Sequence, residues 1–545
     1  MPDWSDLLTF SIDRRAPETL FRQLHGEVRR LILDGVVPPG SRLPATRMVA
    51  ARLGVSRSSV VAVYEQLLAE GYLAGRQGAG TFVSRDLPSP PRLPARRIAG
   101  KVAARPPGAA LRYAALSPDR AQFEAVPFNT GRCSLDEQTL TIWRRLTAAS
   151  LRRPDSLWLG YGDPRGSPRL REALAHYLRI ARGVQCEPEQ ILILSGVQQA
   201  IDLVLKVLIE PGDPVWIEDP AYPAMSAALQ AARARLVPVP VDAQGLVVAR
   251  GVAASPAARA AYVTPSHQSP SGVMLSMARR LELLAWARDA RSWIIEDDYD
   301  SEFRYAGRPL ASLQGIDRGE RVIYLGTFSK VIFPGLRLGY AVVPHELLEA
   351  MTAARHLTDR QAPALTESVV TAFIEQGHFA AHLRRMRAQY RLARDHLAAS
   401  VKARLAAFLD VEVPDQGMRL MARLAPGWRD VALAEQAAAR GLALRPMSKL
   451  YLDAPPVQAL LLGFTGYTMP ALDAGVDRLA EVFAAGAGSS THRFLPCAKR
   501  GGGARVIAGG GGVSTRRRSW LSLRRDTPSG PDYGATSPAK TGEET

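Results

Sequence analysis

The sequence predicts a small, mainly α domain with a β wing, followed by a much larger α/β domain. Its 545 residues exceed what one hydrophobic core usually supports. Residues 84–112 are rich in proline and arginine and lack apolar periodicity, which is typical of a linker. The roughly 370 residues that follow alternate apolar strands with amphipathic helices, and this alternation predicts a largely parallel sheet.

These signals divide the chain into four segments. We expect the first domain over residues 10–84, a linker over 85–120 and the large domain over 121–485. Residues 486–545 contain runs of glycine and arginine, so we expect them to form a disordered, basic tail.

The net charge of +17 is unevenly distributed. Residues 84–112 hold seven Lys or Arg against one acidic residue, and residues 487–545 hold ten against four. Most of the excess charge therefore lies in the linker and the tail. It favours non-specific attraction to phosphates and does not by itself identify a DNA-binding domain.

Composition also narrows the compartment. No run of eighteen apolar residues is present, so we expect no membrane span. The acidic N-terminus lacks the order of a secretory signal. The three cysteines (Cys133, Cys186 and Cys497) are scattered, which favours a reducing cytoplasm with neither a disulfide framework nor a metal site.

The first domain has the pattern of a helix-turn-helix. Apolar residues at helical spacing predict helices over 17–34, 46–53 and 57–70, with Ser56 as the cap of the third. Two short helices joined by a tight turn are typical of this DNA-binding motif. The glycine-rich residues 72–83 predict a β-hairpin wing.

The motifs make this domain similar to the winged helix of GntR-family regulators. They are LFRQL at 20–24, GVVPPGSRLPATR at 35–47, LGVSRSSV at 53–60, YEQLLAEGY at 64–72 and GAGTFV at 78–83. The resemblance implies binding to double-stranded operator DNA. The residues that it implies touch DNA are Arg47, Ser56, Arg57, Ser58, Ser59 and Gly78. A purely structural alternative is that Ser56 only caps a helix and Arg47 only pairs with a nearby acid.

Four loops at strand ends carry the chemistry of the large domain. Ser195 and Gly196 follow the apolar strand QILIL and precede a helix, whose exposed N–H groups suit a phosphate. Tyr222 follows the second strand and could lie against a flat ring, although a packed core tyrosine is the plainer interpretation.

The third and fourth loops are richer in charge. An apolar strand runs into four acids, which we expect to form either a solvated loop or a site: Glu296, Asp297, Asp298 and Asp300. A carboxylate there could keep a pyridine nitrogen protonated. In the fourth loop, hydroxyls and an arginine that suit a phosphate dianion flank Lys330, an amine able to form a Schiff base.

Residues 125–484 resemble the aminotransferase fold of type I pyridoxal-phosphate proteins. The segments YGDPRGSPRLREALAHYL, EDPAYP, TPSHQSPSG, IIEDDYDSEFRY and TFSK resemble the MocR/GabR subfamily of GntR-family regulators in particular. The resemblance implies Lys330 as the Schiff-base lysine and Asp297 as the partner of the pyridine nitrogen, the two catalytic positions. It implies Tyr222 stacked on the ring, Tyr299 near the ring hydroxyl and His267 near the ring. The residues that it assigns to the phosphate are Ser195, Gly196, Val197, Thr327, Ser329 and Arg337.

The sequence departs from this pattern in two places. Ser269 stands where the subfamily usually has an aromatic residue. Leu461 and Leu462 fill the region where aminotransferases usually hold a substrate carboxylate with an arginine. Arg419 and Arg445 are the nearest alternatives for an anionic effector.

Three functions are compatible with these observations. The first is a regulator, expected to be a homodimer, that responds to a small amine, an amino acid or pyridoxal phosphate itself. The second is a working aminotransferase with an accessory DNA-binding domain, against which the missing carboxylate arginine argues. The third is a scaffold that only dimerises, which would not explain why Lys330, Asp297 and Arg337 occur together.

Overall fold

The computed structural model describes residues 12–14, 16–76, 78–87, 106–116, 125–152, 160–307 and 311–488. The chain divides into two units, 1–108 and 109–545, and each has its own core. Most of the expected linker and nearly all of the expected tail lie outside the described residues. None of the described helices is long and apolar enough to span a membrane.

The first unit is a winged helix-turn-helix, as predicted. Its elements are α2 (Leu20–Leu33), α3 (Thr46–Leu53), α4 (Arg57–Ala69), β1 (Leu73–Arg76) and β2 (Gly80–Val83). The three helices share one core that includes Leu24, Val28, Val60 and Leu67. The first helix begins later than expected, at Leu20 rather than at Pro17, because the Thr19 side chain caps it.

The turn between α3 and α4 explains the motif. Gly54 adopts φ 62°, a left-handed conformation that ends α3 at little steric cost. Ser56 then caps α4, since its hydroxyl accepts a hydrogen bond from the Ser59 amide at 3.1 Å. The wing strands pair antiparallel, with Leu73 opposite Val83.

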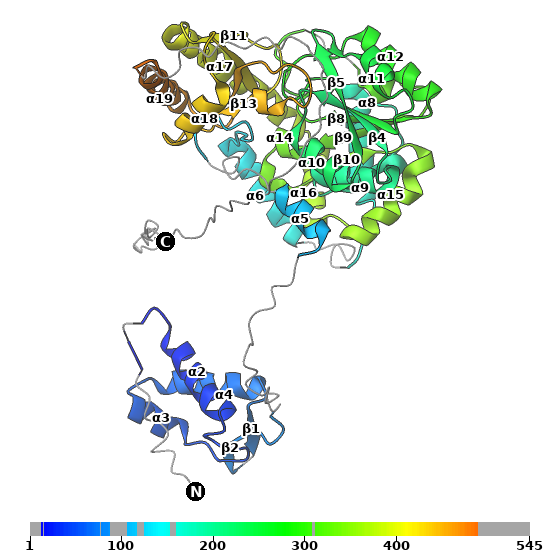
Figure 1. Cartoon of the computed structure of the whole chain (residues 1–545). Coiled ribbons are helices and arrows are strands. Elements are labelled where there is room, and N and C mark those ends of the chain that lie inside the picture. The colour runs from blue at the N-terminus through cyan, green and yellow to red at the C-terminus, as the bar shows by residue number, and fades with distance from the viewer. Residues whose placement is uncertain are drawn as a thin grey trace, which may run out of the picture. The chain divides into compact units, whose positions relative to one another are not determined.

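The second unit contains an eight-stranded sheet in the order β3-β10-β9-β8-β7-β4-β5-β6 (Figure 1). Its strands are β3 (Ile191–Leu194), β4 (Pro214–Asp219), β5 (Arg235–Asp242), β6 (Gly245–Leu246), β7 (Ala260–Val263), β8 (Trp293–Asp298), β9 (Val322–Thr327) and β10 (Gly339–Val342). Strands β9, β8, β7, β4 and β5 pair parallel, which confirms the expected α/β sheet. Strand β10 runs antiparallel between β9 and β3, and β6 pairs antiparallel with β5, so the sheet is mixed.

Strand β8 shows how the sheet is buried on both faces. Ile295 packs in an apolar cluster with residues of α9 (Val197–Leu208) and α10 (Pro223–Ala231). Ile294 packs on the other face with residues of α11 (Val248–Ala254) and α12 (Met277–Asp289). Successive side chains of a strand point to opposite faces. Asp297 therefore faces the α9 and α10 side, and Asp298 faces the opposite side.

Helices surround this sheet. They are α5 (Gly108–Ala115), α6 (Glu137–Arg152), α8 (Pro168–Arg182), α9 (Val197–Leu208), α10 (Pro223–Ala231), α11 (Val248–Ala254), α12 (Met277–Asp289), α13 (Leu313–Ile316), α14 (Phe328–Val331), α15 (His345–Thr358) and α16 (Ala364–Glu375). The helix α5 lies within the expected linker, residues 85–120, so this part of the segment is helical. Four of its eight residues are alanine, the strongest helix former, and none of them is buried.

A second, antiparallel sheet follows, in the order β11-β12-β14-β13. Its strands are β11 (Leu409–Val411), β12 (Arg419–Leu424), β13 (Arg445–Pro446) and β14 (Ala459–Gly463). It is accompanied by α17 (His378–Leu405), α18 (Asp430–Ala438) and α19 (Met469–Gly488), which group together in Figure 1. Strand β12 therefore carries Arg419, and β13 carries Arg445.

Candidate functional site

A cavity of about 400 Å³ lies where the large sheet meets the small one. It brings together residues of three predicted loops, the start of the helix that follows the first loop, and both strands of the small sheet that carry the candidate arginines. Of the predicted residues, those that line it are Val197, Tyr222, Asp297, Tyr299, Thr327, Ser329, Lys330, Arg337, Arg419 and Arg445. This size falls within the range of small-molecule pockets.

Lys330 sits in the short helix α14 that follows β9. Burial lowers its pKa, and the positive charges of Arg419 and Arg445 act in the same direction. The Cys133 thiol donates to the Lys330 carbonyl at 3.3 Å and fixes the backbone there. A lysine with a lowered pKa has a larger fraction of neutral, nucleophilic amine.

Asp297, the last but one residue of β8, faces the cavity and is 3% exposed. One of its oxygens, Oδ2, accepts a hydrogen bond from the Tyr262 hydroxyl at 2.6 Å. The other, Oδ1, is buried without a hydrogen-bond partner among the described residues. Burial raises the pKa of Asp297 to about 7, and the charges of Asp298 and Asp300 add to the increase.

Two tyrosines form walls of the cavity. Tyr222 lies directly before α10, and burial raises its pKa to about 12. The Tyr299 hydroxyl donates to the His267 carbonyl at 2.9 Å and accepts from Arg419 Nη2 at 2.9 Å. The Tyr222 side chain is therefore packed and neutral, and the neutral Tyr299 side chain is held by its two hydrogen bonds.

Hydroxyls and an arginine gather where α9 and α14 begin. Thr327 caps α14 by accepting the Ser329 amide at 3.1 Å. The Ser329 hydroxyl is buried and has no partner among the described residues. Arg337 donates to the Ser195 carbonyl at 2.9 Å, and Gly196 adopts φ 97° so that α9 can start at Val197. These groups provide the donors that a phosphate requires.

Three predicted residues lie outside the lining of this cavity. Ser195 and Gly196 adjoin it, but the Ser195 hydroxyl donates to Asp359 at 3.3 Å. His267 lines a neighbouring cavity of about 820 Å³ and is buried against Asp300, with 2.9 Å between Nδ1 and Oδ2. It contacts Tyr299, which lines the first cavity.

Sequence patterns did not reveal several other lining residues. They include Asn129, Thr130, Gly131, Tyr262 and Thr264. A signal existed for Tyr262, because a tyrosine within the buried strand AAYV needs a partner for its hydroxyl. The loop at 129–131 carries no pattern that distinguishes it, since only the fold brings it to the site.

We expected the four acids at the end of β8 and just after it to form either a solvated loop or a site, and this was wrong for three of them. Glu296, Asp298 and Asp300 are each at most 4% exposed, and none of them lines the cavity. Glu296 accepts the Leu313 and Gln314 amides at 2.8 and 2.9 Å, which anchors the start of α13. These carboxylates are structural because each accepts a hydrogen bond from a buried donor. Most of these donors lie far away in the sequence, so no local pattern indicated them.

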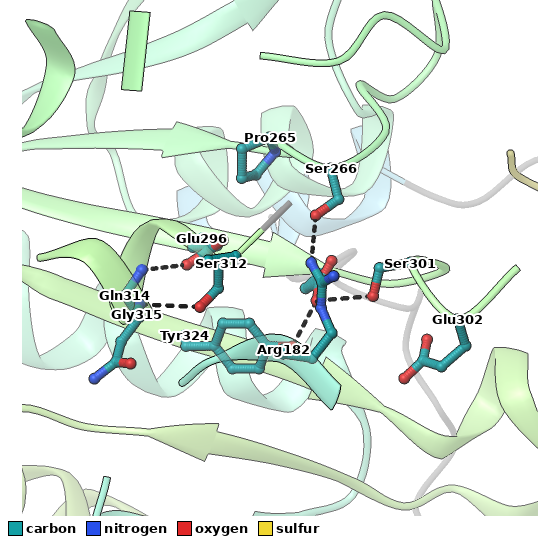
Figure 2. A network of polar contacts seen from close by, with 12 residues as sticks. Arg182, Pro265, Ser266, Glu296, Ser301, Glu302, Ser312, Gln314, Gly315 and Tyr324 are labelled. Carbon is teal, nitrogen blue, oxygen red and sulfur yellow. Dashed lines mark hydrogen bonds and ion pairs between the residues drawn. The ribbon is translucent and has the colours of Figure 1, made fainter. Parts of the chain in front are cut away.

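Asp298 is held by Arg182, the last residue of α8. Arg182 Nε lies 2.7 Å from Asp298 Oδ2, and both side chains are at most 5% exposed. The same oxygen accepts from Tyr324 at 2.6 Å and from Ser301 at 2.9 Å. Figure 2 shows Arg182 reaching between Ser266 and Ser301, and its Nη2 donates to Ser266 at 2.7 Å.

The predicted DNA-contacting residues cluster at two helix starts and in the wing. Arg47 lies in the first turn of α3, and residues 56–59 form the start of α4. Arg47, Ser56, Arg57 and Ser58 are exposed, while Ser59 is half-buried. Gly78 adopts φ 74° in the turn before β2, a conformation that favours glycine.

Comparisons with known proteins agree with this two-part architecture. Residues 20–83 match the family described as "Bacterial regulatory proteins, gntR family", and residues 124–473 match "Aminotransferase class I and II". The chain is 38% identical over 475 residues to the probable rhizopine catabolism regulatory protein MocR of Rhizobium meliloti, covering 87% of this chain and 96% of that protein. It is 32% identical to the pyridoxine biosynthesis transcriptional regulator PdxR of Corynebacterium glutamicum, covering 70% and 79%.

Solved structures resemble the large unit. An archaeal alanine:glyoxylate aminotransferase is 26% identical with a TM-score of 0.62, covering 70% of this chain and 96% of its own. LysN, the α-aminoadipate aminotransferase of Thermus thermophilus, is also 26% identical with a TM-score of 0.63, covering 69% and 97%. The matched winged helix, the matched aminotransferase domain and the near full-length likeness to MocR together show that this chain belongs to the MocR/GabR subfamily of gntR-family bacterial regulators.

Proposed function

We propose that this protein is a transcription regulator that binds operator DNA through its winged helix and holds pyridoxal phosphate in the large unit, which senses an amine. The observation that carries this proposal is the cavity itself. Lys330, Asp297 and Ser329 line one pocket. The pKa of the Lys330 amine is lowered. One Asp297 oxygen and the Ser329 hydroxyl are buried without a hydrogen-bond partner among the described residues. A domain that served only as a scaffold would have no use for this set.

The residues fit pyridoxal phosphate group by group. The free Oδ1 of Asp297 can accept a hydrogen bond from a protonated pyridine nitrogen, which would favour the charged form of the carboxylate despite its burial. The Ser329 hydroxyl and the Arg337 guanidinium can donate to phosphate oxygens. Tyr222 and Tyr299 can bound the ring and exclude water.

When bound, pyridoxal phosphate supplies a carbonyl that captures primary amines reversibly. Lys330 would hold the cofactor through its amine and release it to a competing ligand amine. Differential affinity of that ligand for two states of the large unit is sufficient to alter DNA binding. In a homodimer, two winged helices would be available for two half-sites of an operator.

The first experiment measures binding of the full-length protein to the DNA upstream of its own gene, with and without pyridoxal phosphate. Lys330→Ala is compared with the wild type, and Lys402→Ala, at an exposed lysine of α17, is the matched control. We expect the cofactor to change the affinity or the footprint of the wild type and of Lys402→Ala, but to have less effect on Lys330→Ala. DNA binding that ignores both the cofactor and added amines in all three proteins would overturn the proposal.

Active transamination is a second candidate, because the same cavity contains the lysine and the acid that such chemistry uses. Steady turnover of an amino donor with a keto acid acceptor, absent in Lys330→Ala, would favour it. No turnover across a broad panel of donors, together with a DNA response to amines, would favour the regulator.

A further inference from the structure

Each polar group of Ser195 already has a partner within the protein. Its amide donates to Gln199 Oε1 at 2.7 Å, and its carbonyl accepts from Arg337 Nη2 at 2.9 Å. Its hydroxyl donates to Asp359 Oδ2 at 3.3 Å. Both hydrogen-bond donors of Ser195 are therefore in use, and a phosphate oxygen needs donors.

Asp359 holds this arrangement from outside the cavity. It directly follows α15, and it does not line the cavity. Its Oδ2 accepts from Gln199 Nε2 at 2.8 Å as well as from the Ser195 hydroxyl. Because Gln199 also receives the Ser195 amide, the three side chains close a ring of hydrogen bonds around Ser195. Asp359 thus acts on the cavity through the residues that it holds.

A buried arginine anchors the other side of the Asp359 carboxylate. Oδ1 pairs with Nη1 of Arg355, which lies one turn earlier in α15. The Arg355 side chain is 0% exposed, and its Nε and Nη2 have no hydrogen-bond partner among the described residues. Because loss of the acid would leave this buried cation uncompensated, the pair keeps the carboxylate in place.

The hydrogen bonds lead from Asp359 through Ser195 to Arg337, which lines the cavity. The Arg337 guanidinium also rests against the backbone before α9, since a Cβ added at Gly196 would lie 3.5 Å from Nη2. A shift of Ser195 would therefore move this guanidinium and the first N–H groups of α9 together. Both are donors that suit a phosphate.

We propose that Asp359 is a positioning residue for the phosphate end of the cavity, that it acts through Ser195, and that Ser195 itself binds no phosphate oxygen. This inference rests on the proposed cofactor site. It gives Ser195 a different role from the one that the family resemblance implies. The phosphate oxygens are left to Arg337, Ser329 and the first N–H groups of α9.

The test titrates the full-length protein with pyridoxal phosphate and, separately, with pyridoxal, which lacks the phosphate, and follows the absorption band of the bound compound. Asp359→Asn keeps one oxygen, which cannot serve both Arg355 and the two donors near α9. We expect it to bind pyridoxal phosphate roughly 10-fold more weakly, with its affinity for pyridoxal within about twofold of the wild type. The change in charge alone would act in the opposite direction, because an uncompensated Arg355 attracts a phosphate dianion.

Gln199→Ala opens the same ring of hydrogen bonds without changing a charge. It should weaken the binding of pyridoxal phosphate roughly threefold and leave that of pyridoxal unchanged. This variant also decides the matter if Asp359→Asn does not fold, which the buried Arg355 could cause. Gln230→Ala, at an exposed glutamine of α10 that does not line the cavity, is the matched control and should change neither affinity.

Double variants show whether Asp359 acts through Ser195. Ser195→Ala with Asp359→Asn should bind pyridoxal phosphate no more weakly than Asp359→Asn alone, because both changes remove the same contact. Ser329→Ala with Asp359→Asn should show additive losses, because the Ser329 hydroxyl is free to meet the phosphate directly.

Three results would contradict the proposal. Additive losses in the Ser195 pair would mean that Ser195 binds the phosphate itself. Equal losses for pyridoxal and pyridoxal phosphate would mean that Asp359 only stabilises the fold. Wild-type affinity in both Asp359→Asn and Gln199→Ala would mean that the ring of hydrogen bonds does not position the site. Failure of the proposed cofactor site would instead be seen in the wild type, where neither compound would form a band that Lys330→Ala removes.

Discussion

Asp297 and Asp298 are neighbours at the end of β8, yet they occupy opposite environments. Asp297 faces the cavity, receives one hydrogen bond from a tyrosine and has a pKa raised to about 7. Asp298 faces the other side of the sheet, receives three donors on one oxygen, including the Arg182 guanidinium, and has a lowered pKa. Both are almost fully buried, so burial alone does not separate them.

The two carboxylates differ in the groups that compensate their charge and satisfy their hydrogen bonds. Each keeps one oxygen without a partner among the described residues, but only Asp297 lines a cavity that could admit a donor. The charge of Asp298 is compensated by the protein itself. The protein provides no cation among the described residues that compensates the charge of Asp297 in this way, so a bound ligand would have to do so. Without that ligand, burial disfavours the charged carboxylate and raises its pKa.

The largest expected effect comes from removing the cation that compensates the charge of Asp298. Arg182→Met should lower the free energy of unfolding of the large unit by about 3–5 kcal/mol, because it leaves the Asp298 carboxylate buried without its cation. Urea unfolding followed by tryptophan fluorescence measures this loss, since Trp216 and Trp293 are buried in the large sheet. Adding Asp298→Asn in the same chain should recover much of it. A loss below about 1 kcal/mol would mean that the pair of Arg182 and Asp298 does not hold this end of the sheet.

Asp297→Asn should instead raise the stability of the cofactor-free protein relative to the wild type as the pH rises. A carboxyl group whose folded pKa is raised stabilises the fold only while it is protonated, so its contribution is lost as the pH rises from about 4 to about 7. Because a tenfold change in proton affinity corresponds to roughly 1.4 kcal/mol, the wild type should lose up to a few kcal/mol relative to the variant over this window. Urea midpoints at pH 5, 6, 7 and 8 measure this divergence.

Pyridoxal phosphate should make the wild type the more stable of the two proteins. Saturating pyridoxal phosphate should stabilise the wild type at pH 8 and should bind Asp297→Asn about 10- to 100-fold more weakly, because the amide cannot stabilise a protonated pyridine nitrogen. Parallel midpoints for the two proteins across the whole pH range, with and without the cofactor, would show that Asp297 is structural like Asp298.

Much of the fold could be predicted from local patterns. Helix spacing, the Gly54 turn and the Ser56 cap specify the winged helix within a few residues, since these signals are short in sequence. The ends of β8 and β9 identified Lys330 and Asp297 for the same reason.

The rest depended on contacts between distant segments. Arg182 and Asp298 are 116 residues apart, and no pattern in either segment indicates the partner. The register that sets Arg445 opposite Leu461 also arises only when β13 joins the small sheet. Sequence patterns therefore located acids at the end of β8 but could not indicate which one was already neutralised.

The smallest expected effect applies the same contrast to the winged helix. The Ser56 hydroxyl is occupied by the cap of α4, whereas the Arg57 side chain is exposed. Ser56→Ala should destabilise α4 by about 1 kcal/mol, seen as faster hydrogen exchange of the α4 peptides in the full-length protein. Arg57→Ala should leave that exchange within about 0.5 kcal/mol of the wild type, but it should weaken DNA binding and reduce the dependence of binding on salt by about one counterion. If Arg57→Ala binds DNA with the wild-type affinity and salt dependence, the exposed start of α4 is not the part of the helix that meets phosphates, and the exposed Arg47 of α3 becomes the next position to test.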